Sequence, residues 1–200
     1  MSSLLLVDGN SIINRAYYAT AGRAPMTAPD GTPTGAVNGF FNSVTGIVKE
    51  YAPDHVCVLF DRREPTFRHK MSADYKATRH GMPDDLAAQM PVVKEILDLI
   101  GIARMELTGY EADDLIGTLS RQGEQSGMTV YIYSGDHDDF QLISDKVSVI
   151  MPQSGKDKPS RVLYDRQLFE DTYGVSPEVF VQVKALMGDK SDNITGIDKV

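Results

Sequence analysis

The chain has 200 residues, of which 42% are hydrophobic and 24% charged, and its formal net charge is −8. That length suffices for one buried core, or one core and part of another, and the composition is that of an ordinary globular protein. No apolar run reaches the roughly 20 residues of a membrane span, and residues 1–8 lack the basic start of a secretory leader. The sequence therefore predicts a cytoplasmic protein with no membrane association.

Strand and helix patterns alternate along most of the chain. Short apolar runs predict strands, in chain order, at residues 4–7, 55–60, 102–107, 129–133, 147–151 and 161–164, the last two as edge strands. Helical periodicity predicts helices at about residues 11–18, 35–51, 83–100, 111–125, 140–143, 165–173 and 177–187. Asn10 or Ser11 is placed to cap the first helix. This alternation predicts an α/β fold whose mostly parallel central sheet has helices on both faces.

The single cysteine, Cys57, lies inside the second of these strand runs. A lone cysteine there is typical of a buried small hydrophobic side chain in a reducing compartment. With four scattered histidines and no second cysteine, the sequence argues against a zinc site.

Acidic residues follow three of the predicted strands. Asp8, Asp61 and Asp136 each come after an apolar run, and Asp138 lies two residues beyond Asp136. Because the carboxyl ends of parallel strands lie at one edge of a sheet, where binding crevices form, we expect these side chains to converge. Each acid alone could equally be an ordinary strand-end or turn residue, so the prediction depends on their joint placement.

Three further acids, Glu111, Asp113 and Asp114, fall within four residues at the predicted start of a helix. Complementation of the helix dipole, at roughly 0.3–1 kcal/mol per acid, explains one or two of them and explains a third poorly, because the acids repel one another. Oxygen-only ligation points to Mg²⁺ or Mn²⁺, and the number of carboxylates suits two ions about 3.5–4 Å apart. In such a site one ion activates water for in-line attack and the other stabilises the leaving oxygen.

The overall negative charge is unevenly distributed. Residues 62–80 carry six basic side chains and two acidic ones. This segment has no strong period and, taken alone, reads as a solvated surface loop. An acidic site beside a basic segment, however, suits a metal-dependent enzyme that acts on a polyanion.

Six blocks of the sequence resemble the signature blocks of the 5′ nuclease (flap endonuclease) family. The blocks include Val7–Ser11 with Arg15-Ala16-Tyr17, Phe60-Asp61, Tyr75–Arg79, Glu111–Asp114, Ser134–Asp138 and Leu186–Ile194. Their order and spacing are most similar to the N-terminal 5′–3′ exonuclease domain of bacterial DNA polymerase I. The resemblance runs from residue 4 to the end of the chain. His137 stands where the family usually has Lys or Arg.

The resemblance implies a PIN-like fold and a two-metal site that removes RNA primers and 5′ flaps during DNA replication and repair. It assigns the first Mg²⁺ or Mn²⁺ to Asp8, Asp61, Glu111, Asp113 and Asp114. It assigns the second to Asp136, Asp138, Asp189 and Asp192. Catalysis would depend chiefly on Asp8, Asp61, Asp113 and Asp136, together with Lys76 and Arg79 at the scissile phosphate.

The resemblance also implies how the nucleic acid is held. Residues 62–85 would form a basic arch around the 5′ single strand of a flap or an RNA–DNA primer junction. The implied nucleic-acid contacts are Arg15, Tyr17, Arg68, Lys70, Tyr75, Lys76 and Arg79. Residues 1–164 would be the catalytic domain, and residues 165–200 the start of a helix–hairpin–helix region whose K⁺ site is incomplete. We expect a monomeric fragment with weakened duplex binding and turnover, joined to a polymerase domain in the full-length protein.

Two competing functions remain at this stage. A phosphatase with an aspartyl nucleophile also places Asp after a strand, but it needs a second Asp two residues later, where this chain has Asn10. The other competitor is a non-catalytic DNA-binding module whose acids are structural.

Overall fold

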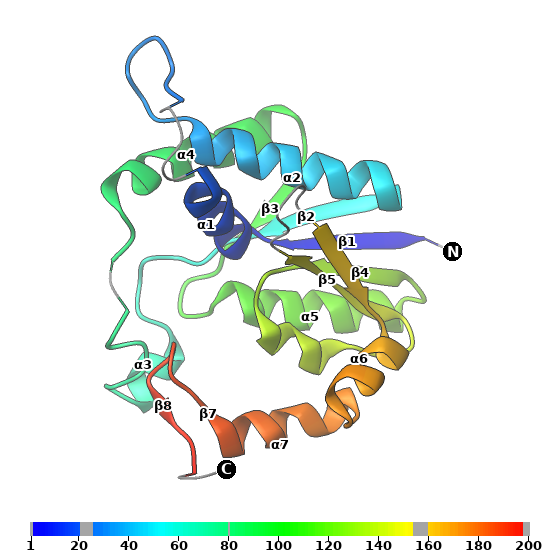
Figure 1. Cartoon of the computed structure of the whole chain (residues 1–200). Helices are drawn as coiled ribbons and strands as arrows, with labels where there is room; N and C mark the ends of the chain where they lie inside the picture. Colours follow the sequence, from blue (N-terminus) through cyan, green and yellow to red (C-terminus); the bar gives the residue numbers. More distant parts are fainter. Residues whose placement is uncertain (1, 21–25, 80, 154–159, 198–200) are drawn as a thin grey trace.

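A six-stranded sheet forms the centre of the molecule (Figure 1). The computed structural model describes residues 2–20, 26–79, 81–153 and 160–197. The sheet order is β3-β2-β1-β4-β5-β6. The strands are β1 (Ser3–Asp8), β2 (His55–Leu59), β3 (Ala103–Met105), β4 (Thr129–Tyr133), β5 (Val147–Gln153) and β6 (Ser160–Tyr164). All neighbouring pairs are parallel except β5 and β6. The mostly parallel sheet is confirmed.

Helices cover both faces of the sheet, as the alternating pattern predicts. One layer holds α1 (Gly9–Thr20), α2 (Gly35–Tyr51) and α4 (Asp84–Leu99). The other holds α5 (Ala112–Gln125), the 3-10 helix η1 (His137–Leu142), α6 (Arg166–Tyr173) and α7 (Pro177–Met187). Side chains of β1 alternate between the layers: Leu5 and Val7 pack with α1 and α2, and Leu6 packs with α5. Cys57 is buried in the second core, as predicted.

The strand order places a topological switch point between β1 and β4. From β1 the chain continues to β2 and β3 on one side, and it later returns to β4 on the other side of β1. Connections therefore leave the two central strands in opposite directions, which opens a crevice outside their carboxyl ends. Asp8 ends β1, and Asp136 follows β4 by three residues, so both lie at that crevice.

Three local predictions need correction. The strand at residues 147–151 is not an edge strand, because β5 lies between β4 and β6. The first helix begins at Gly9 and is capped by Asp8, whose Oδ1 accepts a hydrogen bond from the Ser11 amide at 2.9 Å; neither Asn10 nor Ser11 is the cap. The region read as a loop contains the short helix α3 (Phe67–Met71).

The C-terminal segment packs against the end of the basic region. It forms two short strands, β7 (Gly188–Asp189) and β8 (Ile194–Thr195), next to α3 (Figure 1). The Lys76 amide donates to the Asp192 carbonyl at 3.0 Å, and the Asn193 side chain donates to the Asp74 carbonyl at 2.9 Å. These bonds bring residues more than a hundred positions apart to one side of the crevice. Within the described ranges, no helix has the length and apolar character needed to cross a membrane.

Candidate metal and nucleic-acid site

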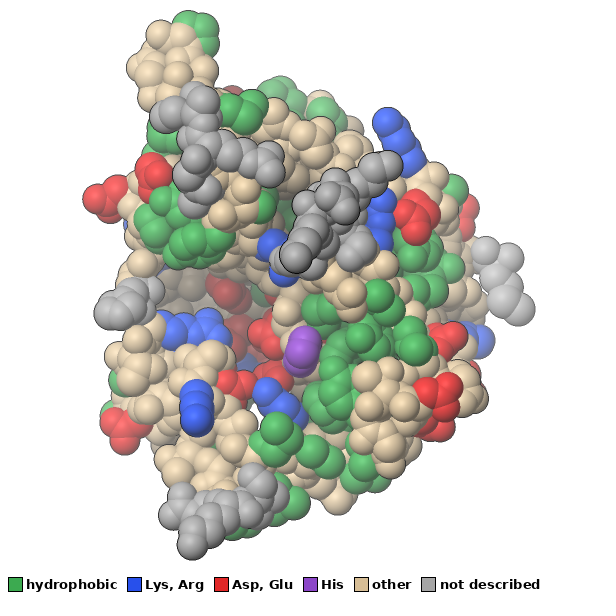
Figure 2. Space-filling model, in the orientation of Figure 1, with side chains coloured by type: hydrophobic (Ala, Val, Ile, Leu, Met, Phe, Trp, Pro, Cys, Tyr) green, Lys and Arg blue, Asp and Glu red, His purple; other side chains and the backbone are tan. Residues whose placement is uncertain are grey.

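The predicted carboxylates meet in one cavity of about 1080 Å³ at the switch point. Eight of the nine line it: Asp8, Asp61, Glu111, Asp113, Asp114, Asp136, Asp138 and Asp192. Asp189 lies beside it, in a smaller cavity that it shares with Asp138 and Asp192. Figure 2 shows a hollow in which acidic side chains lie deep and basic side chains lie near the rim. The structure therefore confirms that acidic side chains from both halves of the chain lie close together.

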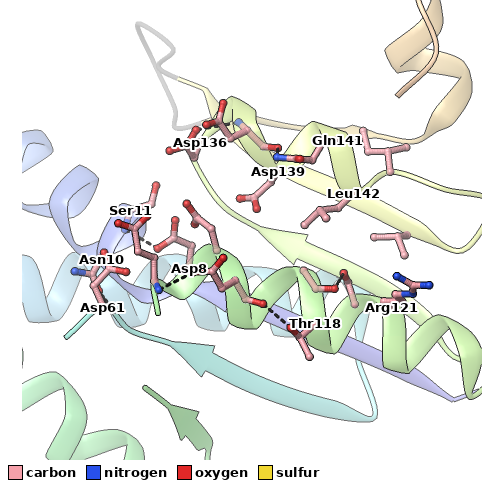
Figure 3. A pocket seen from close by; sticks show the side chains of 18 of the residues that line it. Asp8, Asn10, Ser11, Asp61, Thr118, Arg121, Asp136, Asp139, Gln141 and Leu142 are labelled. Atoms are coloured by element: carbon pink, nitrogen blue, oxygen red, sulfur yellow. Dashed lines mark hydrogen bonds between the residues drawn. The ribbon is translucent and has the colours of Figure 1, made fainter. Parts of the chain in front are cut away.

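A chain of hydrogen bonds holds the loops after β1 and β4 together. The Ser134 hydroxyl donates to Asp8 Oδ2 at 3.1 Å and accepts from the Asp136 amide at 3.0 Å. The Ser11 hydroxyl accepts from the Gly135 amide at 3.0 Å. Ser11 and Ser134 therefore fix the distance between the two strand ends, and with it the relative positions of Asp8 and Asp136. Figure 3 shows Asp8, Ser11 and Asp136 at this cavity.

The loop after β2 is anchored in the same way. Asn10 Oδ1 accepts from the Asp61 amide at 3.0 Å, and Asp61 Oδ1 accepts from the Ala112 amide at 2.7 Å. Asp61 thus satisfies a free amide at the start of α5, where the helix dipole also favours a negative charge. Asp114, in the first turn of α5, accepts from the Glu111 amide at 2.9 Å. Asp113 makes none of these capping bonds and lines the cavity instead.

Basic side chains neutralise the acids at the rim. Arg68 donates two hydrogen bonds of 2.8 Å to Asp114, and Lys76 Nζ lies 3.0 Å from Glu111 Oε2. Arg79 pairs with Asp192. These three cations all come from residues 62–82, so this segment faces the acidic cavity directly.

Lys184 of α7 performs the same role farther along the rim. Its Nζ lies 2.7 Å from Asp138 Oδ1 and 2.8 Å from Asp189 Oδ2. Burial acts to raise the pKa of Asp189, but the hydrogen bonds from Lys184 and Ser191 outweigh it and hold that pKa well below its usual value. For Asp114, burial is likewise outweighed by its hydrogen bonds from Arg68 and from the Glu111 amide, and the pKa is lowered.

The deep acids behave in the opposite way. Burial, assisted by repulsion from Asp61 and Asp136, raises the pKa of Asp8 to about 6, despite the hydrogen bonds that it accepts from Ser11 and Ser134. Burial raises the pKa of Asp113 to about 8, and the nearby Asp8, Asp136 and Asp61 carboxylates add to this shift. Burial also raises the pKa of Asp136. Like charges this close disfavour joint ionisation unless a cation binds among them.

One acid in the cavity was missed by the sequence reasoning. Asp139 is 2% exposed and lines the cavity, and its pKa is raised well above the usual value by burial and by Asp113 and Asp8. Oxygens of Asp8, Asp113 and Asp139 all lie within 4.8 Å of one another. The sequence signal for this acid is the run Asp136-His137-Asp138-Asp139, in which a third Asp directly follows Asp138. The family motif includes only Asp136 and Asp138, so Asp139 was not among the predicted ligands.

The seven predicted nucleic-acid contacts lie in three places. Arg68, Tyr75, Lys76 and Arg79 line the acidic cavity, and the Tyr75 hydroxyl donates to Glu111 Oε2 at 3.0 Å. Lys70 is exposed on α3. The other two are on α1: the Tyr17 hydroxyl donates to Asp85 at 2.8 Å, and Arg15 lines a separate groove with residues of α2 and β6.

The donor set fits a hard divalent cation. The deep ligating atoms are all carboxylate oxygens, with no imidazole or thiolate among the described lining residues, and such sets suit Mg²⁺, Mn²⁺ or Ca²⁺. One oxygen of Asp139 is buried without a hydrogen-bond partner, and a cation in the cavity would satisfy it.

Residues 3–174 match the family described as 5′-3′ exonuclease, N-terminal resolvase-like domain. The chain belongs to this family. It is 42% identical to the thermostable DNA polymerase I of Thermus filiformis over 194 residues, which are 97% of this chain and 22% of that protein. It is 39% identical to the 5′-3′ exonuclease of Aquifex aeolicus, covering 100% of this chain and 66% of the relative. The chain thus spans about a fifth of the polymerase and about two thirds of the exonuclease.

Solved structures support the fold. The bacteriophage T5 5′-exonuclease with bound zinc superposes with a TM-score of 0.75 at 23% identity, covering 99% of this chain and 71% of that one. The T5 flap endonuclease in a pseudo-enzyme–product complex with DNA and metal ions gives 0.74 at 22% identity, with the same coverage. The predicted PIN-like α/β fold is confirmed.

Proposed function

We propose that this chain is a metal-dependent 5′ nuclease domain that hydrolyses phosphodiester bonds at 5′ flaps and RNA–DNA primer junctions. One observation carries the proposal: acids from the ends of three strands and the start of α5 share a cavity whose rim is basic. A polyanion bound at that rim would lie directly over the acids. The relatives named DNA polymerase I suggest that a polymerase domain accompanies this one in the full-length protein.

The carboxylates fall into two sets that could hold two Mg²⁺ or Mn²⁺ ions. We assign Asp8, Asp61, Glu111, Asp113 and Asp114 to the first ion. We assign Asp136, Asp138, Asp189 and Asp192 to the second. When bound, such ions activate water for in-line attack and stabilise charge on the phosphate oxygens.

The protein's own residues would contribute by exchanging partners. Arg68, Lys76 and Arg79 each pair with a carboxylate at the rim. A phosphodiester offers these cations another anionic partner, and a divalent ion offers the carboxylates another cation. The Arg68–Asp114 and Arg79–Asp192 pairs are partly exposed, so each is worth only about 0–1 kcal/mol and its exchange costs little. The Lys76–Glu111 pair is largely buried, so a bound phosphate and a metal ion would have to replace both partners together. Lys76 and Arg79 would then face the scissile phosphate and stabilise the charge that develops in the transition state.

The segment at residues 62–85 is the proposed arch around the 5′ strand. Tyr75 offers a ring on which an unpaired base could stack, at about 1–3 kcal/mol per base. Its ring lies 5.0 Å from Lys76 Nζ, so stacking and phosphate binding would occur side by side. Residues 165–200 are proposed to begin the region that binds the duplex.

The test is cleavage of a labelled 5′-flap duplex by wild type, Asp113→Asn and the control Asp171→Asn, with Mg²⁺ or with chelator. Asp171 is exposed on α6 outside the cavity. We expect the wild type to cleave near the flap junction only when Mg²⁺ is present. Asp113→Asn should lose this cleavage while largely retaining flap binding, and Asp171→Asn should cleave as the wild type does. Hydrolysis of small phosphate esters without flap cleavage would indicate a phosphatase. Flap binding without cleavage would indicate a binding module.

A further inference from the structure

Asp139 lies where the sequence motif does not require an acid. The 3-10 helix η1 turns its consecutive acids in different directions: Asp138 contacts Lys184 at the rim, whereas Asp139 points into the cavity (Figure 3). The stacked rings of His137 and Phe140, with centroids 5.2 Å apart, flank the two acids. Phe140 is fully buried against Phe169 and Phe180, so it anchors the turn that aims Asp139 inward.

The surroundings of Asp139 do not explain it as a structural residue. A buried carboxylate normally accepts hydrogen bonds or pairs with a cation. Asp139 is 2% exposed, its Oδ2 has no hydrogen-bond partner, and no described Lys or Arg lies within ion-pairing distance. The Ser134 hydroxyl hydrogen-bonds to the side chain, but this bond does not offset the effect of burial on the carboxylate. Asp8 and Asp113, whose oxygens lie within 4.8 Å, likewise form no ion pair with a described Lys or Arg.

The geometry of the three carboxylates is close to that of a cation site. Oxygens of Asp8, Asp113 and Asp139 lie within 4.8 Å of one another. In an octahedral magnesium site with metal–oxygen distances of about 2.0–2.1 Å, ligand oxygens lie about 2.9 Å apart when adjacent and about 4.2 Å apart when opposite. Inward side-chain shifts of up to roughly 1 Å per oxygen would bring all three oxygens onto one such ion.

We propose that Asp139 is a direct ligand of the divalent ion held by Asp8 and Asp113, a tenth carboxylate in addition to the nine implied by the family motifs. The inference rests on the proposed function in one respect, that the cavity binds a divalent ion. It goes further in assigning this chain a ligand whose role is to complete the deepest part of the site. Asp139 brings a third carboxylate to that ion from η1, an element separate from β1 and α5.

The first experiment measures Mn²⁺ binding by calorimetry to chelator-treated protein. Wild type is compared with Asp139→Asn, with Asp113→Asn as the reference and Asp171→Asn as the surface control. We expect Asp139→Asn to weaken the tightest site by at least about tenfold, as Asp113→Asn does, and Asp171→Asn to bind as wild type. Unchanged affinity and stoichiometry in Asp139→Asn alone would overturn the proposal while leaving the proposed function intact. Absence of Mn²⁺ binding by wild type would instead overturn the metal site of the proposed function.

The second experiment separates direct coordination from a loss of nearby charge. A thiolate prefers soft metals, so Asp139→Cys should bind Cd²⁺ in preference to Mn²⁺ and develop cadmium–thiolate absorption in the ultraviolet. Wild type, whose Cys57 lies in β2 and is buried in the core, and Asp171→Cys serve as controls. Cadmium–thiolate absorption confined to Asp139→Cys supports ligation. A folded Asp139→Cys protein, with wild-type circular dichroism, that binds Cd²⁺ without this absorption would refute it.

Discussion

The acidic cavity predicts that the metal-free protein is less stable at pH 8 than at pH 5.5. Asp8 and Asp113 have folded-state pKa values of about 6 and about 8, against 3.8 for an ordinary Asp. A raised pKa means that the folded state holds its proton more tightly than the unfolded chain does. The stability that these protons provide is complete below pH 3.8 and is lost as the pH rises through the folded-state values.

The magnitude follows from the size of the shifts. Each pH unit between the unfolded and folded pKa values removes about 1.4 kcal/mol per group. From pH 5.5 to 8, Asp113 contributes a loss over about 2.5 units and Asp8 over about half a unit, roughly 4 kcal/mol together. This loss is a large share of the free energy of unfolding of a typical protein, which is about 5–15 kcal/mol. The acids with lowered pKa values, Asp114 and Asp189, are ionised in both the folded and the unfolded state across this window and add no slope.

Urea unfolding of chelator-treated protein, followed by circular dichroism at several pH values, measures this effect. The Asp113→Asn variant should lose about 3.5 kcal/mol of the change between pH 5.5 and 8, because 2.5 pH units correspond to about 1.4 kcal/mol each. The raised pKa values of Asp136 and Asp139 lower the stability in the same direction and account for the slope that remains. Addition of Mg²⁺ at about 100 times its Kd should restore about 2.7 kcal/mol at pH 8, because the ion binds only the folded state. The prediction would be contradicted if the free energy of unfolding of the metal-free protein stayed constant or rose from pH 5.5 to 8, and if Asp113→Asn had the same slope. Such a result would show that burial and mutual repulsion do not raise the pKa values of the cavity acids.

Three further substitutions test separate parts of the site. Asp136→Asn should abolish flap cleavage while leaving flap binding largely intact, and wild-type turnover would defeat the assignment. Lys76→Ala should lower kcat by about 10²–10³-fold if its ammonium stabilises transition-state charge, whereas an effect on KM alone would reduce Lys76 to a positioning contact. Gly9→Ala should lower the free energy of unfolding by about 1–3 kcal/mol, since a methyl group there would overlap the fully buried Phe60 ring; an unchanged urea midpoint would contradict this.

The sheet and the convergence of acids could be predicted because each depends on local patterns. Apolar runs fix the strands, and parallel strands share the edge where Asp8, Asp61 and Asp136 lie. Position within the sheet is not local. The run of β5 resembles an edge strand by its length and flanking turn, yet pairing with both β4 and β6 places it inside.

Details of the site depend on tertiary contacts that no spacing rule contains. Asn10 is a good cap by residue type, but its side chain is used to bind the Asp61 amide, and Asp8 caps α1 instead. Asp139 is adjacent to Asp138 in the sequence, and only the tight turn of η1 sends one side chain to the rim and the other into the cavity. These outcomes depend on which side chains meet after folding, so they could not be read from residue type alone.

The acids of this site have three ways to be neutralised, and the structure divides them by depth. Asp114, Asp138, Asp189 and Asp192 at the rim, and the buried Glu111 next to it, pair with basic side chains. The deep acids Asp8, Asp113 and Asp139 form no ion pair with a described basic side chain, so protons or bound cations must balance their charge. A divalent ion should therefore enter the deep set by displacing protons, whereas a rim ion must displace Lys184.

The deep site should accordingly bind Mn²⁺ more weakly as the pH falls, while Lys184→Met should strengthen binding at the rim and leave the deep affinity unchanged. Calorimetry at two pH values on both proteins would measure this, and identical pH dependence at every site would contradict the division.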